Sequence, residues 1–258
     1  MGTDMKRILA LLACLALPLC AQWDNRKTPN VPRNADGSPN LKAPAPRTAD
    51  GKVDLSGIWE PEGIKFLINI AADLKPGDIP FRPDYEQVYR QRKADLGKAD
   101  PDARCLPTGY PRKDAITSPY KILQMPDLIV MLQESRTTFR QIFLDGRKLP
   151  VDPQPTWEGY AIGHWEGNDT LVVESSGYNG KAWLDSDGHP MTDALKLTER
   201  FTRPNFGTLN IEITIDDPKA YTKPWTVREH PHLLVDGTDL IESVCNENER
   251  DLVHLVGK

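Results

Sequence analysis

The polar residues that could do chemistry gather in one stretch and in the strand that follows it. Residues 178–190 bring tyrosine, tryptophan, histidine and aspartate side chains together in a polar loop. In the segment after this loop, alternation places Leu197, Glu199 and Phe201 on one face. A carboxylate in an apolar row is costly unless it is paired or used, and burial raises its pKa toward the range where acid–base catalysis works near neutral pH.

Two interpretations of this carboxylate stay open. In the first, Glu199 and His189 converge at the mouth of a cavity as an acid–base set, and Asp185 or Asp187 completes the set. In the second, Glu199 pairs with Arg140 and only supports the structure. The segment from Asp185 to His189 is then a turn, for which its Asp-Gly dipeptide is a strong signal.

Other residues are candidates for contacting a ligand. Tryptophan and tyrosine rings stack on aromatic ligands and sugars. The predicted ligand-binding residues are Trp183, Tyr178, Asn179, Arg140 and His164. Trp183 lies in the polar loop, whereas a core-filling role fits Trp59, Trp157, Trp165 and Trp225. A hydrogen-bonded position in the core or at the rim is the alternative for His164.

The sequence contains no complete catalytic or metal-binding motif. It has no GxSxG elbow, no phosphate-binding Walker loop, no HExxH and no GxGxxG. His230 and His232 have the spacing that places two imidazoles on one face of a strand, but no third ligand lies at a fixed spacing. Pro231 marks an edge strand or the end of a strand. We therefore predict no metal and no cofactor.

Length and composition are those of a single globular domain. The chain has 258 residues, enough to bury a core. Its net charge of −5 argues against sequence-independent binding of nucleic acid, which needs a basic surface. Its 23 prolines, about twice the usual share, disfavour a mainly helical protein, because proline removes a backbone donor and breaks helix interiors.

Residues 1–21 are typical of an export signal. Lys6 and Arg7 precede an apolar stretch, Ile8–Leu19, that is too short to span a bilayer comfortably. We expect cleavage before Gln22 and a periplasmic or extracellular location, with a lipoprotein modified at Cys20 as the less favoured alternative. No later stretch has the length and apolar character of a transmembrane helix.

Two cysteines remain after cleavage, Cys105 and Cys245. An even number of cysteines in an oxidising compartment predicts a disulfide between them. Two separate buried thiols are the alternative. No Cys/His spacing indicates a structural zinc site.

The mature chain divides into a leader and one domain. Residues 22–54 hold five prolines and few large apolar residues, which predicts a linker or an arm that wraps the domain. Residues 55–258 form the domain. One amphipathic helix begins at Pro83-Asp84, and its apolar positions run from Tyr85 to Leu96 before a stop at Gly97.

The rest of the domain is typical of short strands joined by tight turns. The predicted strands are Leu55–Glu60, Lys121–Met125, Leu128–Glu134, Thr138–Leu144, Trp157–Trp165, Thr170–Ser175, Leu195–Arg203, Thr208–Asp216, Trp225–His230 and Asp239–Cys245. After Tyr120 no helix-length segment separates two strands, so a parallel sheet is not expected. Closing such a meander into a barrel removes its exposed edges.

Residues 55–59, LSGIW, resemble the Gly-x-Trp opening of lipocalins and their calycin relatives. The resemblance implies a barrel whose floor is plugged by Trp59, with a late-strand arginine, Arg200 or Arg203, packed on it. We therefore expect a mostly β fold: an antiparallel up-and-down barrel of about 8–10 strands, calycin-like, with one helix. A two-sheet β-sandwich is the second choice.

Four further segments resemble a large family of uncharacterised secreted soil-bacterial proteins. They are Cys105–Pro111, Phe139–Arg147, Gly163–Val173 and Tyr221–Trp225, and the resemblance extends from about Asp54 to Lys258. It implies a secreted location and nothing about the chemistry.

Three functions stay open at this point. The first is a secreted barrel that binds a small hydrophobic or aromatic molecule. The second is a barrel enzyme for proton transfer, an isomerase, lyase or hydrolase, with Glu199 and His189 as its acid–base pair. The third is an envelope structural protein without a ligand. An open cavity that holds one buried carboxylate favours the first two, and an interior filled by side chains favours the third.

Overall fold

The chain forms one mixed β-sheet that closes on itself. The computed structural model describes residues 26–75 and 77–247, so the predicted export signal lies outside the described residues. The strands are β1 (Gly57–Glu60), β2 (Tyr120–Gln124), β3 (Leu128–Gln133), β4 (Thr138–Phe143), β5 (Tyr160–Glu166), β6 (Thr170–Ser176), β7 (Lys196–Asn205), β8 (Thr208–Asp216), β9 (Trp225–Glu229) and β10 (His232–Leu234).

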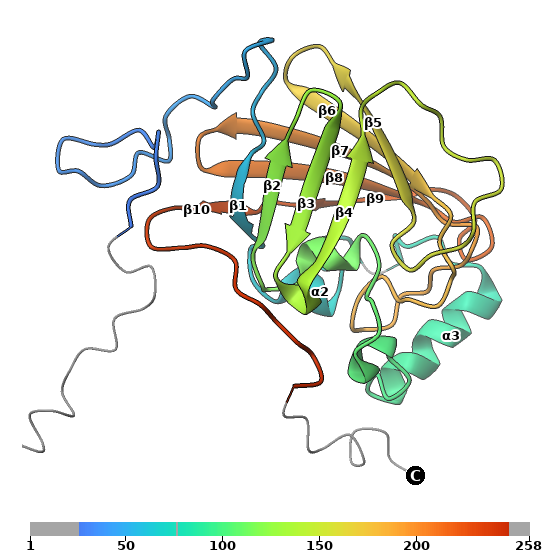
Figure 1. Cartoon of the computed structure of the whole chain (residues 1–258). Helices are drawn as coiled ribbons and strands as arrows, with labels where there is room; N and C mark the ends of the chain where they lie inside the picture. Colours follow the sequence, from blue (N-terminus) through green and yellow to red (C-terminus); the bar gives the residue numbers. More distant parts are fainter. Residues whose placement is uncertain (1–25, 76, 248–258) are drawn as a thin grey trace, which may run out of the picture.

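Strand β10 closes the barrel. Strands β1 to β8 are neighbours in chain order, and β10 pairs with β1 on one side and with β8 on the other. The predicted barrel is thereby confirmed as a closed barrel of nine strands, with β2–β4 on one wall and β7 and β8 on the opposite wall (Figure 1). Strand β9 pairs with β8 as well, and the break between β9 and β10 falls at Pro231, which has no N–H to donate.

Two predictions about the strands are wrong. Strands β4 and β5 are parallel, because the connection 144–159 carries the chain back before β5 begins, so the barrel is mixed rather than purely antiparallel. The segment Asp239–Cys245 is not a strand. Asp239 there binds Lys121 from outside the barrel, and Cys245 is bonded to Cys105, so this segment is held by side chains rather than by a ladder.

Alternation along the strands builds the core. In β7 and β8 every second side chain is buried, and the buried apolar residues of these strands are Leu197, Phe201, Leu209, Ile211, Ile213 and Ile215. Near the start of the barrel, Trp59 is fully buried and the guanidinium of Arg203 lies 4.9 Å from the centre of its ring. This is the packing expected of Trp59, with Arg203 rather than Arg200 as the arginine.

The helices gather at one end of the barrel (Figure 1). They are α2 (Lys65–Ile68) and α3 (Pro83–Ala94), with short 3-10 turns η1 (Pro101–Arg104), η2 (Arg112–Ala115) and η3 (Ser135–Thr137). The predicted start of α3 is confirmed, but no residue of α3 is buried and Leu96 lies beyond its end, 92% exposed. Among the described residues, no helix combines the length and the apolar character needed to cross a membrane.

The leader wraps the barrel, as one of its two interpretations predicts. Val31 and Val53 are buried, and backbone hydrogen bonds tie residues 41–53 to barrel loops. A second attachment is Asp236, whose carboxylate accepts hydrogen bonds from Arg33 and from the backbone N–H of Thr28. The described part of the leader is therefore an arm fixed at several points.

The predicted disulfide between Cys105 and Cys245 is present, with their Cα atoms 5.7 Å apart and 140 positions between them in sequence. It joins the irregular segment before η2 to the segment that follows the barrel. We expect Cys105→Ser/Cys245→Ser to lower the free energy of unfolding by about 5 kcal/mol, because a long closed loop restricts the unfolded chain. Urea unfolding of the variant and of the oxidised protein measures the difference, and equal midpoints would contradict the prediction.

Candidate functional site

An ion pair crosses the barrel interior. Arg140 on β4 and Glu199 on β7 are both buried, and the guanidinium binds the carboxylate through two hydrogen bonds, one of them 2.9 Å from Nη1 to Oε1. The guanidinium also lies 4.0 Å from the centre of the Tyr110 ring. Of the two interpretations of Glu199, the structure shows the pairing with Arg140.

Two further carboxyl groups lie near this pair. Asp114 on η2 and Glu229 on β9 are buried, and their carboxyl oxygens have no hydrogen-bond partner among the described residues. Burial raises the pKa of both groups well above the ordinary range, and the charge of Glu199 adds to the effect. Both groups are therefore held toward the neutral acid form.

Aromatic and amide side chains complete this interior cluster. Nε2 of Gln133 donates to the Tyr110 hydroxyl at 3.2 Å, and the hydroxyls of Ser175 and Tyr178 are 2.7 Å apart. The Tyr120 hydroxyl is buried and has no partner among the described residues. A water-sized cavity would leave accessible surface on the side chains around it, yet these residues are 0–3% exposed. Side chains fill this part of the barrel.

His189 and Asp185 form a second buried pair. Nδ1 of His189 lies 2.5 Å from Oδ2 of Asp185, and both side chains are fully buried. Among the described residues, no hydrogen bond or ring contact links this pair directly to Glu199. The structure thus brings together two of the three predicted catalytic residues and places the third in the barrel ion pair. Asp187 instead binds Nζ of Lys93 at 2.7 Å.

The predicted ligand-binding residues do not share one pocket. Trp183 is buried, and the guanidinium of Arg92 lies 4.4 Å from the centre of the Trp183 ring. Tyr178 belongs to the filled interior of the barrel. Asn179 caps a turn through the backbone N–H of Lys181, and His164 is exposed on β5. Arg140 is taken up by Glu199.

The two histidines on either side of Pro231 bind different side chains. Nδ1 of His230 lies 2.9 Å from the Asn210 side chain, and Nε2 of His232 lies 3.0 Å from Glu60. Within residues 26–75 and 77–247, no group of three or more potential ligands is arranged to hold a metal ion.

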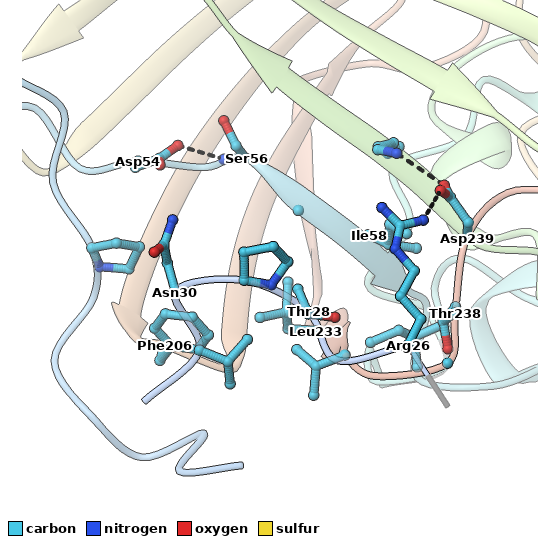
Figure 2. A pocket seen from close by; sticks show the side chains of 18 of the residues that line it. Arg26, Thr28, Asn30, Asp54, Ser56, Ile58, Phe206, Leu233, Thr238 and Asp239 are labelled. Atoms are coloured by element: carbon cyan, nitrogen blue, oxygen red, sulfur yellow. Dashed lines mark hydrogen bonds and ion pairs between the residues drawn. The ribbon is translucent and has the colours of Figure 1, made fainter. Parts of the chain in front are cut away.

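A pocket of about 310 Å³ lies between the leader and the barrel (Figure 2). We call it the leader pocket. Its apolar lining is Val31, Ile58, Phe206, Leu233, Leu234 and Val235. Arg26 and Asp239 lie toward one end of the view, and Asn30 and Asp54 toward the other, so polar groups of both signs border an apolar middle.

Two carboxyl groups of the interior cluster and the leader pocket were not predicted from the sequence. Glu229 lies two positions after Val227 in β9, and both side chains are buried. The same period-two pattern identified Glu199, so it could also have predicted that Glu229 is buried. Asp114 sits in an irregular proline-rich segment that has no periodicity to reveal a buried carboxyl group. The leader pocket joins residues more than 200 positions apart, and no local signal marks such a pairing.

The Arg140–Glu199 pair predicts a large stability effect. Glu199→Gln leaves a buried guanidinium without its counter-charge, so the free energy of unfolding should fall by about 3–5 kcal/mol in urea titrations. The matched control is Glu166→Gln, which removes the carboxylate from the exposed Arg200–Glu166 pair and should change little. Equal effects of the two substitutions would contradict a buried structural pair.

The raised pKa values of Asp114 and Glu229 predict that stability falls as pH rises. Above about pH 4 the unfolded chain ionises these carboxyls while the folded protein keeps them protonated, so each stabilises folding less as pH increases toward its folded pKa. Urea unfolding at several pH values should give Asp114→Asn a shallower decline than the wild type. Asp152→Asn, at an exposed carboxylate, is the control, and a decline as steep in Asp114→Asn as in the wild type would refute the assignment.

The geometry is the basis of the functional argument. No protein-family model matches the chain, and no curated protein is significantly similar to it in sequence.

Proposed function

We propose that this protein is an exported barrel that binds a small hydrophobic or aromatic molecule in the leader pocket. The observation that carries the proposal is the pocket itself: an apolar middle bordered by polar groups, at a volume within the range of ligand sites, about 300–1,000 Å³. The disulfide supports export, because such bonds persist in oxidising compartments.

The carboxylate of Asp236 fixes the part of the leader that forms one wall of the leader pocket. Asp236 accepts hydrogen bonds from Arg33 and from the backbone N–H of Thr28, and its own N–H donates to the Thr28 hydroxyl at 2.8 Å. These bonds lower the pKa of Asp236, so the carboxylate stays ionised at neutral pH. Because this wall is already fixed, binding of a ligand costs less conformational entropy.

The barrel interior supports the pocket rather than offering a second site. Arg203 packs on Trp59 and donates to the backbone carbonyls of Asp54, Ser56 and Phe206, three residues that surround the pocket. Removal from water lowers the pKa of Arg203 to about 10, which still leaves it charged at neutral pH. The filled interior around Arg140 favours the competing proposal, a structural protein of the envelope without a ligand.

Native mass spectrometry of the mature protein from its own periplasm tests the proposal. We expect a bound small molecule, and saturable binding of the fluorescent probe 1-anilinonaphthalene-8-sulfonate that the bound molecule displaces. Ile58→Trp fills the pocket from β1 and should weaken probe binding at least about tenfold, or about 1.4 kcal/mol. Ile162→Trp, a half-buried position on β5, is the control. No bound molecule and no saturable binding would favour the structural alternative.

A further inference from the structure

A second pocket, of about 640 Å³, lies against the His189–Asp185 pair and shares no lining residue with the leader pocket. We call it the dyad pocket. Residues from 69–75 and 77–81 line one side, and α3 lines the other. Its apolar lining is Ala71, Ala72, Leu74, Ile79, Phe81 and Tyr89, and His189 contributes to the wall.

Backbone groups hold the Asp185 carboxylate in a single position. Oδ1 accepts from the N–H groups of Gly188 and His189, at 2.9 and 3.1 Å, and Oδ2 accepts from the N–H of Ile70 at 2.8 Å. The carboxylate therefore faces the imidazole as an oriented acceptor. This is more than the turn chemistry expected of the segment, because the side chain bridges the turn and the segment that leads into the pocket.

The oriented carboxylate decides where the imidazole proton sits. Nδ1 of His189 donates to Asp185, so in the neutral ring Nε2 is the acceptor. Nε2 is buried and has no hydrogen-bond partner among the described residues. An unpaired acceptor in such a place is costly unless a ligand satisfies it.

An unpaired donor belongs to the same ring cluster. The Trp225 ring lies 6.2 Å from the His189 ring, centre to centre, and its Nε1–H is buried without a partner among the described residues. A hydroxyl group can donate to an imidazole nitrogen and can accept from an indole N–H. A hydroxyl group therefore supplies the donor that Nε2 of His189 lacks.

The rest of the pocket selects the body of the ligand. The Tyr89 ring is stacked 4.2 Å from His189, and Phe81 is stacked on both, so the wall around the imidazole is aromatic. Three cations, Lys75, Arg90 and Lys93, line the pocket. Arg90 pairs with Glu86, and Lys93 pairs with Asp187. Lys75 has no side-chain partner among the described residues, so it suits an anion.

We propose that the dyad pocket binds a small phenolic carboxylate, whose hydroxyl donates to Nε2 of His189 and whose carboxylate faces the cations at the rim. Tyr89 is the half-buried ring beside His189, and its helix, α3, has no buried residue. Displacement of this ring opens the way to Nε2. His189 is here a ligand-binding residue, and Asp185 positions it.

Isothermal titration of the mature protein with 4-hydroxybenzoate, benzoate and phenol tests the proposal. We expect 4-hydroxybenzoate to bind at least about tenfold more tightly than benzoate, which lacks the hydroxyl, and than phenol, which lacks the carboxylate. In the ¹⁵N spectrum of the native protein, the Nε2 resonance of His189 should move with 4-hydroxybenzoate and stay in place with benzoate. A water molecule at this position would leave the resonance unmoved by either ligand.

Four variants sharpen the test. His189→Phe keeps the ring and removes the acceptor, so the preference for 4-hydroxybenzoate over benzoate should disappear, whereas His164→Phe on the barrel surface should retain it. Lys75→Ala should weaken both carboxylates equally and leave phenol unchanged. Ile58→Trp should have no effect, because it blocks the other pocket. Should His189→Phe not fold, the ¹⁵N titration of the wild type decides. Equal affinities for benzoate and 4-hydroxybenzoate, a preference that survives in His189→Phe, or no binding of any probe would overturn the proposal.

Discussion

The closure of the sheet at β10 is the constraint on which the rest of the structure depends. Because β10 pairs with both β1 and β8, the sheet closes, and most of the side chains that face inward are removed from water. Charged groups that face inward must then find partners inside the barrel. Arg140 and Glu199 satisfy this requirement across the barrel, from β4 to β7.

The same closure explains why the two pockets lie outside the barrel. The interior near the ion pair is occupied by tyrosine, glutamine and carboxyl side chains, and both pockets form where other segments pack against the barrel. The leader covers β1 and β10 and borders one pocket, and α3 borders the other together with residues from 69–75 and 77–81. The leader and the segments around α3, which lie outside the barrel strands, therefore form the surfaces that a ligand can contact.

Sequence reasoning predicted the barrel because alternation is a local property. The period-two patterns of β7 and β8, the tight turns and the Gly-x-Trp segment all carry their signal within a few residues. It failed where pairing depends on distant segments. The parallel contact of β4 with β5 is set by where the chain returns after the connection 144–159. The pairing of β10 with β1 joins segments that lie far apart in the sequence, and no local pattern marks it.

The sequence by itself determined which residues needed special surroundings: a carboxylate among apolar neighbours at Glu199, a cysteine pair, and a histidine four positions after an aspartate. Only the tertiary structure decided their partners. Glu199 forms an ion pair with Arg140 rather than with His189. The guanidinium lies in the same barrel interior and stabilises the desolvated carboxylate most. His189 met Asp185 on a turn outside that interior, since backbone N–H groups there hold the carboxylate in place. The sequence indicates which buried polar side chains need a partner, and the folded structure determines which group becomes that partner.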